Sequence, residues 1–145
     1  MIRILCVGKI KEKYLEDLIT DYLSRIRKYH KIEIIELKDN INHEKELQDL
    51  KNKINKNDFN IALDLRGKLI SSLDFSSKIE KTFMVNSNIT FIIGGSLGLD
   101  VEILDLADDV ISFSNMTFPH GLFRGVLLEQ IYRSFKIMNN ESYHK

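Results

Sequence analysis

Five short apolar runs, each separated from the next by a stretch with helical periodicity, constrain this chain more than any other feature. The runs lie at residues 2–7, 32–37, 59–65, 89–93 and 110–113. The second run alternates apolar and charged residues, so we expect a more exposed strand there. Strands that alternate with helices build a mainly parallel sheet with helices on both faces. The sequence therefore predicts an α/β fold.

Amphipathic segments connect the apolar runs. In the first segment Leu15, Leu18 and Ile19 recur at three- and four-residue steps, a pattern typical of a helix with one buried face. We predict Ser71 or Ser72 and Asp100 as helix N-caps. The residues Arg66-Gly67-Lys68 are predicted to form a turn after the third strand. The predicted helices span 11–28, 43–54, 71–84, 99–107 and a last one from Pro119, which suits a first turn, to near Tyr143.

Bulk properties exclude several classes of protein. A length of 145 residues predicts one domain, 1–145. The net charge of zero argues against a generic nucleic-acid-binding domain, and we expect no DNA partner. No apolar run approaches the roughly 20 residues of a membrane helix, and the start of the chain resembles a strand instead of a signal peptide.

Cysteine and histidine usage narrows the possibilities further. The single Cys6 cannot form an internal disulfide, which favours a cytoplasmic location. One cysteine and four scattered histidines have no metal-ligand spacing, so no metal site is expected.

The segment Gly94-Gly95-Ser96-Leu97-Gly98 is the first candidate for a binding loop. It follows a predicted strand and precedes a predicted helix. Glycines there allow the backbone to approach a ligand closely. The spacing differs from the Gly-x-Gly-x-x-Gly of dinucleotide folds, and the Gly-Lys-Ser/Thr of a P-loop is missing. From these residues alone, a ligand loop and a tight structural turn both stay open.

The segment Ser112-Phe113-Ser114-Asn115-Met116-Thr117-Phe118 is the second candidate. It mixes small hydroxyl side chains with apolar ones and has no helical period. Backbone polar groups beside an apolar wall suit an adenosine ring, whereas a polyphosphate would need the Lys or Arg that the segment lacks. An ordinary strand-to-helix loop is equally compatible. Both candidate loops follow parallel strands and should meet at the carboxyl edge of the sheet, where α/β folds bind ligands.

The last helix and the chain end carry further candidates. His120 lies at a helix start, which favours a neutral imidazole that can accept a proton, orient a loop or simply bond to the backbone. Glu129, Arg133 and Lys136 share one helix face, where ion pairing within the helix and an arginine reaching RNA are both possible. The tail Tyr143-His144-Lys145 is either a frayed end or a functional segment.

Two glycines interrupt the same helix. An interior glycine costs about 1 kcal/mol relative to alanine. Gly121 and Gly125 therefore either permit close packing against another helix or subunit, or are simply tolerated.

These blocks, in this order, resemble the ribosomal RNA large-subunit methyltransferase H family of the SPOUT superfamily. The resemblance covers essentially the whole chain. It includes Ile4-Leu5-Cys6-Val7-Gly8-Lys9 and Leu63-Asp64-Leu65-Arg66-Gly67-Lys68. It is strongest at 91–98, 112–120, 129–133 and 143–145.

The resemblance implies a fold and an activity. It implies a deep trefoil knot, with the knot and the cofactor site within about 63–145, and a homodimer. It also implies S-adenosylmethionine as methyl donor and N3-methylation of a pseudouridine in a 23S rRNA hairpin, with the assembled ribosome as substrate. The donor contacts carried over are Leu63, Gly94, Phe113, Ser114, Asn115, Met116, Thr117 and Phe118. The catalytic or substrate residues carried over are Arg133, His144, Tyr143 and His120, with the partner subunit's tail completing each site.

Two other functions stay open at this point. One is a methyltransferase of the same fold that acts on another RNA, such as tRNA. The other is a non-catalytic protein that binds a nucleotide or the ribosome. A dinucleotide-dependent dehydrogenase is disfavoured because the glycine spacing is wrong.

Overall fold

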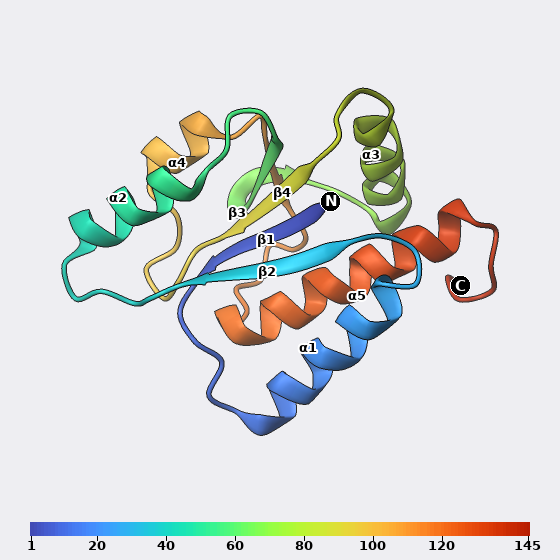
Figure 1. Ribbon diagram of the computed structural model, residues 1–145, viewed down its shortest axis with the longest axis horizontal. Coiled ribbons are helices and arrows are strands. Elements are labelled where there is room, and N and C mark those ends of the chain that lie inside the picture. The colour runs from blue at the N-terminus through green and yellow to red at the C-terminus, as the bar shows by residue number, and fades with distance from the viewer.

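The computed structural model describes residues 1–145, and its five strands form one sheet in the order β2-β1-β4-β3-β5 (Figure 1). Every neighbouring pair of strands is parallel, as the alternation of strands and helices predicted. β2 lies at an edge, which explains its alternating pattern and its partial exposure. The strands are β1 (Ile2–Val7), β2 (Ile32–Leu37), β3 (Phe59–Leu69), β4 (Ile89–Ile93) and β5 (Asp109–Ser112).

The helices cover both faces of the sheet. α1, α3 and α5 pack together on one face, while α2 and α4 lie on the other (Figure 1). β1 shows why the strands have to be continuously apolar, since Ile2, Ile4 and Cys6 enter the larger core and Leu5 and Val7 enter the smaller one. The helices are α1 (Lys13–Ile26), α2 (His43–Lys53), α3 (Ser72–Val85), α4 (Val101–Leu106) and α5 (His120–Met138). None of them is long and apolar enough to cross a bilayer.

Side-chain caps begin three of the helices. The Ser71 hydroxyl accepts a hydrogen bond from the Asp74 N–H at 3.1 Å, and the Asp100 carboxylate accepts one from the Glu102 N–H at 3.0 Å. Both caps confirm the sequence prediction. Asn42 caps α2 in the same way, which the sequence reasoning did not assign.

The two glycines of α5 let it approach α1 closely. A Cβ added at Gly125 would lie 2.6 Å from Leu18 Cδ2, and one at Gly121 would lie 3.2 Å from the Cδ1 atoms of Ile10 and Leu15. Of the two explanations that the sequence left open, close helix packing is therefore the one the structure supports.

β3 is longer than predicted, and the expected turn at Arg66-Gly67-Lys68 was wrong. Leu63 and Lys68 both pair with Ile111 of β5, so the residues between them form a bulge inside a continuing strand. A Cβ at Gly67 would lie 2.7 Å from the backbone of Ile111. The glycine that suggested a turn is needed for this close approach of two strands, because pairing with β5 overrides the local turn signal.

The last helix also ends earlier than predicted, at Met138 and not near Tyr143. Asn140 adopts a left-handed conformation with φ 54°, which Asn tolerates better than most residues. The Glu141 N–H then donates to the Lys136 carbonyl at 2.9 Å, a bond that turns the chain back at a helix end. The tail 139–145 consequently turns back and packs against the rest of the protein.

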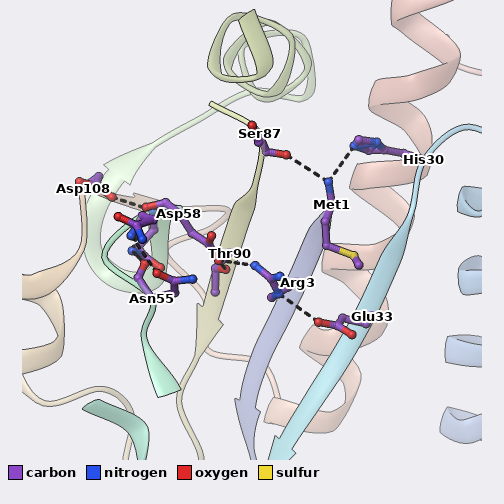
Figure 2. Close-up of polar contacts among 11 residues, drawn as sticks. Met1, Arg3, His30, Glu33, Asn55, Asp58, Ser87, Thr90 and Asp108 are labelled. Carbon is purple, nitrogen blue, oxygen red and sulfur yellow. Dashed lines mark hydrogen bonds and ion pairs between the residues drawn. The ribbon is translucent and has the colours of Figure 1, made fainter. Parts of the chain in front are cut away.

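A polar network closes the amino edge of the sheet (Figure 2). The Arg3 guanidinium pairs with the buried Asp58 at 2.5 Å and with Glu33 at 3.0 Å. The Thr90 hydroxyl donates to the same Asp58 oxygen at 2.9 Å. β1, β4 and the residue before β3 are thus joined through Oδ2 of Asp58, whose buried Oδ1 has no hydrogen-bond partner.

The N-terminus extends this network. The Met1 amino group donates to the Ser87 carbonyl at 3.2 Å and lies 3.4 Å from His30 Nε2 (Figure 2). His30 is half-buried, with its ring centroid 4.5 Å from that of Phe83. The first residue of the chain is therefore fixed at the amino edge.

Candidate functional site

A cavity of about 810 Å³ opens at the carboxyl edge of the sheet, over β3, β4 and β5. Leu63 of β3, Gly94 after β4 and Phe113 after β5 contribute to its lining. The chain thus brings together the two loops that the sequence singled out, at the edge where parallel sheets bind ligands.

The glycine loop forms one wall. A Cβ at Gly94 would lie 2.5 Å from the Gly98 carbonyl carbon, so only glycine allows the loop to close on itself. Gly98 has a φ of 74°, and its N–H donates to the Gly95 carbonyl at 3.0 Å. The loop is therefore a tight turn that also lines the cavity, and the two readings that the sequence left open are not exclusive.

The loop after β5 forms the facing wall. The Phe113 ring packs on Phe75, with centroids 5.1 Å apart, and on Phe123 at 5.5 Å. Within the loop the Ser114 hydroxyl accepts a hydrogen bond from the Met116 N–H at 2.9 Å. Met116 is 72% exposed and is free to contact a ligand. Of the eight predicted donor contacts only Asn115 lies outside the lining.

Asp64 and Arg66 also line the cavity, and the sequence reasoning missed both as site residues. The Arg66 guanidinium donates to Asp64 at 2.7 and 2.9 Å and to the Leu99 carbonyl at 2.6 Å. The hydrogen bond from Arg66 holds the pKa of Asp64 below its usual value, so the pair stays ionised. Arg66 thereby ties the β3 bulge to the end of the glycine loop. The only signal in the sequence was the block around Gly67, which we had interpreted as a turn.

His120 lines the cavity from the start of α5, but the other three predicted catalytic residues do not. Arg133 lies further along the same helix, about 20 Å away at 1.5 Å per residue. Tyr143 and His144 lie beside Arg133. Within one chain the structure therefore separates the tail residues from the cavity.

The tail residues form a cluster around Arg133. Its guanidinium pairs with Glu129 at 2.6 Å, contacts His144 Nδ1 at 3.1 Å and lies 4.8 Å from the centre of the Tyr143 ring. The Tyr143 hydroxyl donates to Glu129 at 3.1 Å. Burial raises the pKa of Tyr143 well above its usual value, so the phenol stays protonated. Ion pairing within α5, one of the two possibilities that the sequence left open, is present between Glu129 and Arg133, while Lys136 pairs with Glu141 in the tail.

A buried arginine closes the rest of the carboxyl edge. Arg124 of α5 is 2% exposed, pairs with Glu36 of β2 at 2.5 Å and donates to the Gly8 carbonyl after β1 at 3.1 Å. The carboxyl edge is thus sealed over β1 and β2, and it is open over β4, β3 and β5. No group of three or more His, Cys, Asp or Glu side chains is arranged to hold a metal ion.

The fold and this cavity define an α/β domain with a cavity of a size that suits a small ligand at the carboxyl edge of its sheet. A family model described as predicted SPOUT methyltransferase matches residues 1–144, and the chain belongs to that family. The trefoil knot that the resemblance implied is compatible with this family and stays a prediction.

Relatives extend over the full chain. The chain is 50% identical to a ribosomal RNA large subunit methyltransferase H 1 of Clostridium perfringens strain SM101, with 99% of each chain covered. It is 49% identical, with the same coverage, to a ribosomal RNA large subunit methyltransferase H of Clostridium botulinum strain Okra.

A solved structure supports the fold alone. It is described as that of a probable methylase family protein from Haemophilus influenzae Rd KW20 and is 12% identical to this chain. The TM-score is 0.62, with 99% of this chain and 70% of that chain covered.

Proposed function

We propose that this protein transfers a methyl group from S-adenosylmethionine to N3 of a pseudouridine in 23S rRNA, on the assembled ribosome. The observation that carries the proposal is full-length similarity, at 50% identity, to relatives named ribosomal RNA large subunit methyltransferase H. The cavity between the two predicted loops adds support, because its walls have the chemistry that a nucleoside donor needs.

The residues that line the cavity fit this donor. Phe113, Met116 and Phe118 offer apolar surface for an adenine face, and the glycine loop offers backbone groups for its polar edge. Arg66 is engaged by Asp64, so the cavity presents no unpaired cation to a polyphosphate. When bound, the donor supplies an electrophilic methyl group. We propose Leu63, Gly94, Phe113, Ser114, Met116, Thr117 and Phe118 as its contacts, with Asn115 contributing only to the path of the loop.

The distance between the cavity and the tail cluster motivates a homodimer. About 20 Å of α5 separates His120 from Arg133, so one chain cannot place both beside one target base. We propose that the partner subunit's Arg133 and the partner subunit's His144 complete each site. In this arrangement His120 orients the loop beside the donor, and the tail approaches the target base from the other side.

The tail cluster suggests distinct roles for its members. N3 of the base must lose its proton, and Tyr143 is poorly suited to accept it because its phenol is protonated and donates to Glu129. A guanidinium cannot accept a hydrogen bond, so His144 Nδ1 is the acceptor in its contact with Arg133. We propose that Arg133 turns to the developing oxyanion of the ring, which leaves Nδ1 of His144 to take the N3 proton.

The test is mass spectrometry of 23S rRNA after ribosomes that lack the modification are incubated with the protein and S-adenosylmethionine. We expect one added methyl group on the pseudouridine, and ribosomes left unmodified would overturn the proposal. Methylation of free tRNA instead of ribosomes would favour the other RNA target. Calorimetric titration without donor binding would favour a non-catalytic protein.

An Arg133→Ala variant separates donor binding from turnover. We expect its dissociation constant for S-adenosylmethionine to stay unchanged, because Arg133 does not line the cavity. Turnover should fall by roughly a hundredfold or more, the usual cost of losing an oxyanion donor. A loss of donor affinity would contradict the role assigned to Arg133.

A further inference from the structure

The tail is held by one residue that lies outside the proposed chemistry. Both carboxylate oxygens of Glu141 accept from the Tyr29 hydroxyl, at 2.9 and 3.0 Å. Lys136 Nζ donates to one of these oxygens at 2.9 Å. Tyr29 follows α1 and Lys136 belongs to α5, so Glu141 connects the tail to two separate parts of the fold.

We propose that Glu141 is a positioning residue, which fixes the direction in which Tyr143 and His144 leave α5 and so presents them to the substrate. The inference rests on the proposed function, in which these tail residues take part in methyl transfer. Asn140 sets the reversal of the chain through its left-handed backbone, and Glu141 is the first side chain after that reversal with a partner outside the tail.

The contact that holds His144 is lost during the reaction, whereas Tyr143 stays packed on the Tyr132 ring, with centroids 4.9 Å apart. His144 contacts Arg133, and Tyr143 contacts Glu129 and the Arg133 face. When Arg133 turns to the substrate, His144 loses its partner. Glu141 keeps both of its partners in that step, because neither Tyr29 nor Lys136 contacts a group that the reaction uses for proton transfer.

Electrostatics keep the contacts of Glu141 with Tyr29 and Lys136 formed at neutral pH. The hydrogen bond from Lys136 holds the pKa of Glu141 below its usual value, and the same contact raises that of Lys136. Lys136 also lies over the rings of Tyr29 and Tyr132, at 5.7 and 5.5 Å from their centres. The ammonium is thus directed toward Glu141 by the aromatic surface beneath it.

The test compares Glu141→Ala with Glu141→Gln in the full-length protein. We expect Glu141→Ala to lower kcat on ribosomes by roughly ten- to a hundredfold, because a misplaced catalytic group loses rate steeply. The donor dissociation constant and the KM for ribosomes should change little. Glu141→Gln keeps an oxygen for the Tyr29 hydroxyl and should recover much of the rate.

A matched control is Glu80→Ala on α3, since Glu80 is an exposed glutamate with no ion-pair or hydrogen-bond partner from its side chain. It should leave kcat unchanged. If Glu141→Ala keeps the kcat of the wild type, or loses donor affinity in proportion to kcat, Glu141 does not position the tail.

A spectroscopic readout tests the positioning separately from catalysis. In the wild type, the His144 ring signals should have the linewidth of an ordered side chain in ¹³C–¹H spectra. In Glu141→Ala they should sharpen toward those of a mobile tail, with the midpoint of thermal unfolding unchanged. Unaltered His144 signals would overturn the inference even if the wild type methylates ribosomes. Altered signals in a protein that does not methylate ribosomes would refute the proposed function alone.

Discussion

The two edges of this sheet treat their polar groups in opposite ways. At the amino edge, Arg3, Asp58 and Thr90 neutralise and hydrogen-bond one another between β1, β3 and β4 (Figure 2). At the carboxyl edge, β3 and β4 together with β5 lead into segments rich in glycine and in hydroxyl and aromatic side chains around a cavity. One edge pairs most of its polar groups internally, whereas the other leaves surface for a ligand.

This difference indicates a division of roles along each strand. At one end of β4 the Thr90 hydroxyl donates a hydrogen bond to Asp58. At the other end, only a few residues away, the strand leads into Gly94. Changes at the amino edge should affect stability and spare donor binding, and changes in the open part of the carboxyl edge should do the reverse.

The largest expected effect is at the amino edge. Asp58→Ala leaves Arg3 and Thr90 without their shared acceptor, and removing one partner of a buried ion pair costs about 3 kcal/mol of unfolding free energy. Urea unfolding measures this loss, and calorimetry should show unchanged affinity for S-adenosylmethionine. The matched control is Glu33→Gln, whose carboxylate is 46% exposed and should contribute roughly 0–1 kcal/mol. Equal losses from the two variants would contradict the buried role of Asp58.

The sealed part of the carboxyl edge should resemble the amino edge. Arg124→Met leaves the buried Gly8 carbonyl without its donor, which should lower the unfolding free energy by about 2 kcal/mol. Glu36 is 39% exposed and can be rehydrated, so the loss should be smaller than for Asp58→Ala. Urea unfolding tests this, with Lys13→Met on an exposed face of α1 as the silent control. If Arg124→Met lost more binding free energy for the donor than unfolding free energy, the sealed part would contribute to donor binding, and the distinction from the open part would not hold.

Substitutions in the open part of the carboxyl edge should change donor affinity more than stability. In Gly94→Ala the new Cβ meets the Gly98 carbonyl carbon at 2.5 Å, so the loop has to move and donor affinity should fall by at least about tenfold. Gly95→Ala is the control one residue away, where the nearest atom to the new Cβ is Val7 Cγ1 at 3.4 Å, an ordinary contact distance. Calorimetric titration of both variants decides the matter, and similar affinities would show that the shape of the loop does not limit binding.

The smallest effect concerns the core between the two edges. Burial raises the pKa of the Cys6 thiol to about 11, from an ordinary value of 9.0. The folded state therefore favours the neutral thiol, and this contribution is complete below pH 9 and is lost as the pH rises toward 11. The stability difference between the wild type and Cys6→Ala should be constant up to pH 9 and shrink above it, as urea unfolding at several pH values would show. A difference that stays constant above pH 9 would mean that the folded state does not raise the pKa of the thiol, as when water reaches the core.

The sheet and most helix boundaries could be predicted because they depend on local periodicity and caps. The strand around Ile4 contacts a core on each face of the sheet and is therefore apolar on both sides. Asp100 is a typical capping residue and stands directly before α4. The extension of β3 could not be predicted, since Gly67 is a turn signal locally and its reason is the backbone of Ile111, more than forty residues later.

The site could be predicted in part. The small-residue loops at Gly94 and Phe113 were visible as loops, and the resemblance supplied the nature of the ligand. Asp64 and Arg66 were missed because their role depends on the Leu99 carbonyl, a contact that no spacing reveals. Likewise, only the fold shows that α5 places Arg133 far from its own cavity.

The packing of α5 against α1 has a consequence for how the protein is made. α1 ends at Ile26 and α5 begins at His120, so roughly 94 residues are synthesised between them. At about 5–20 residues per second, the apolar stripe of α1 waits on the order of 5–20 s for the helix that covers it. Small domains usually fold within about a second or less. The apolar face of α1 therefore waits for its partner helix longer than an ordinary small domain takes to fold.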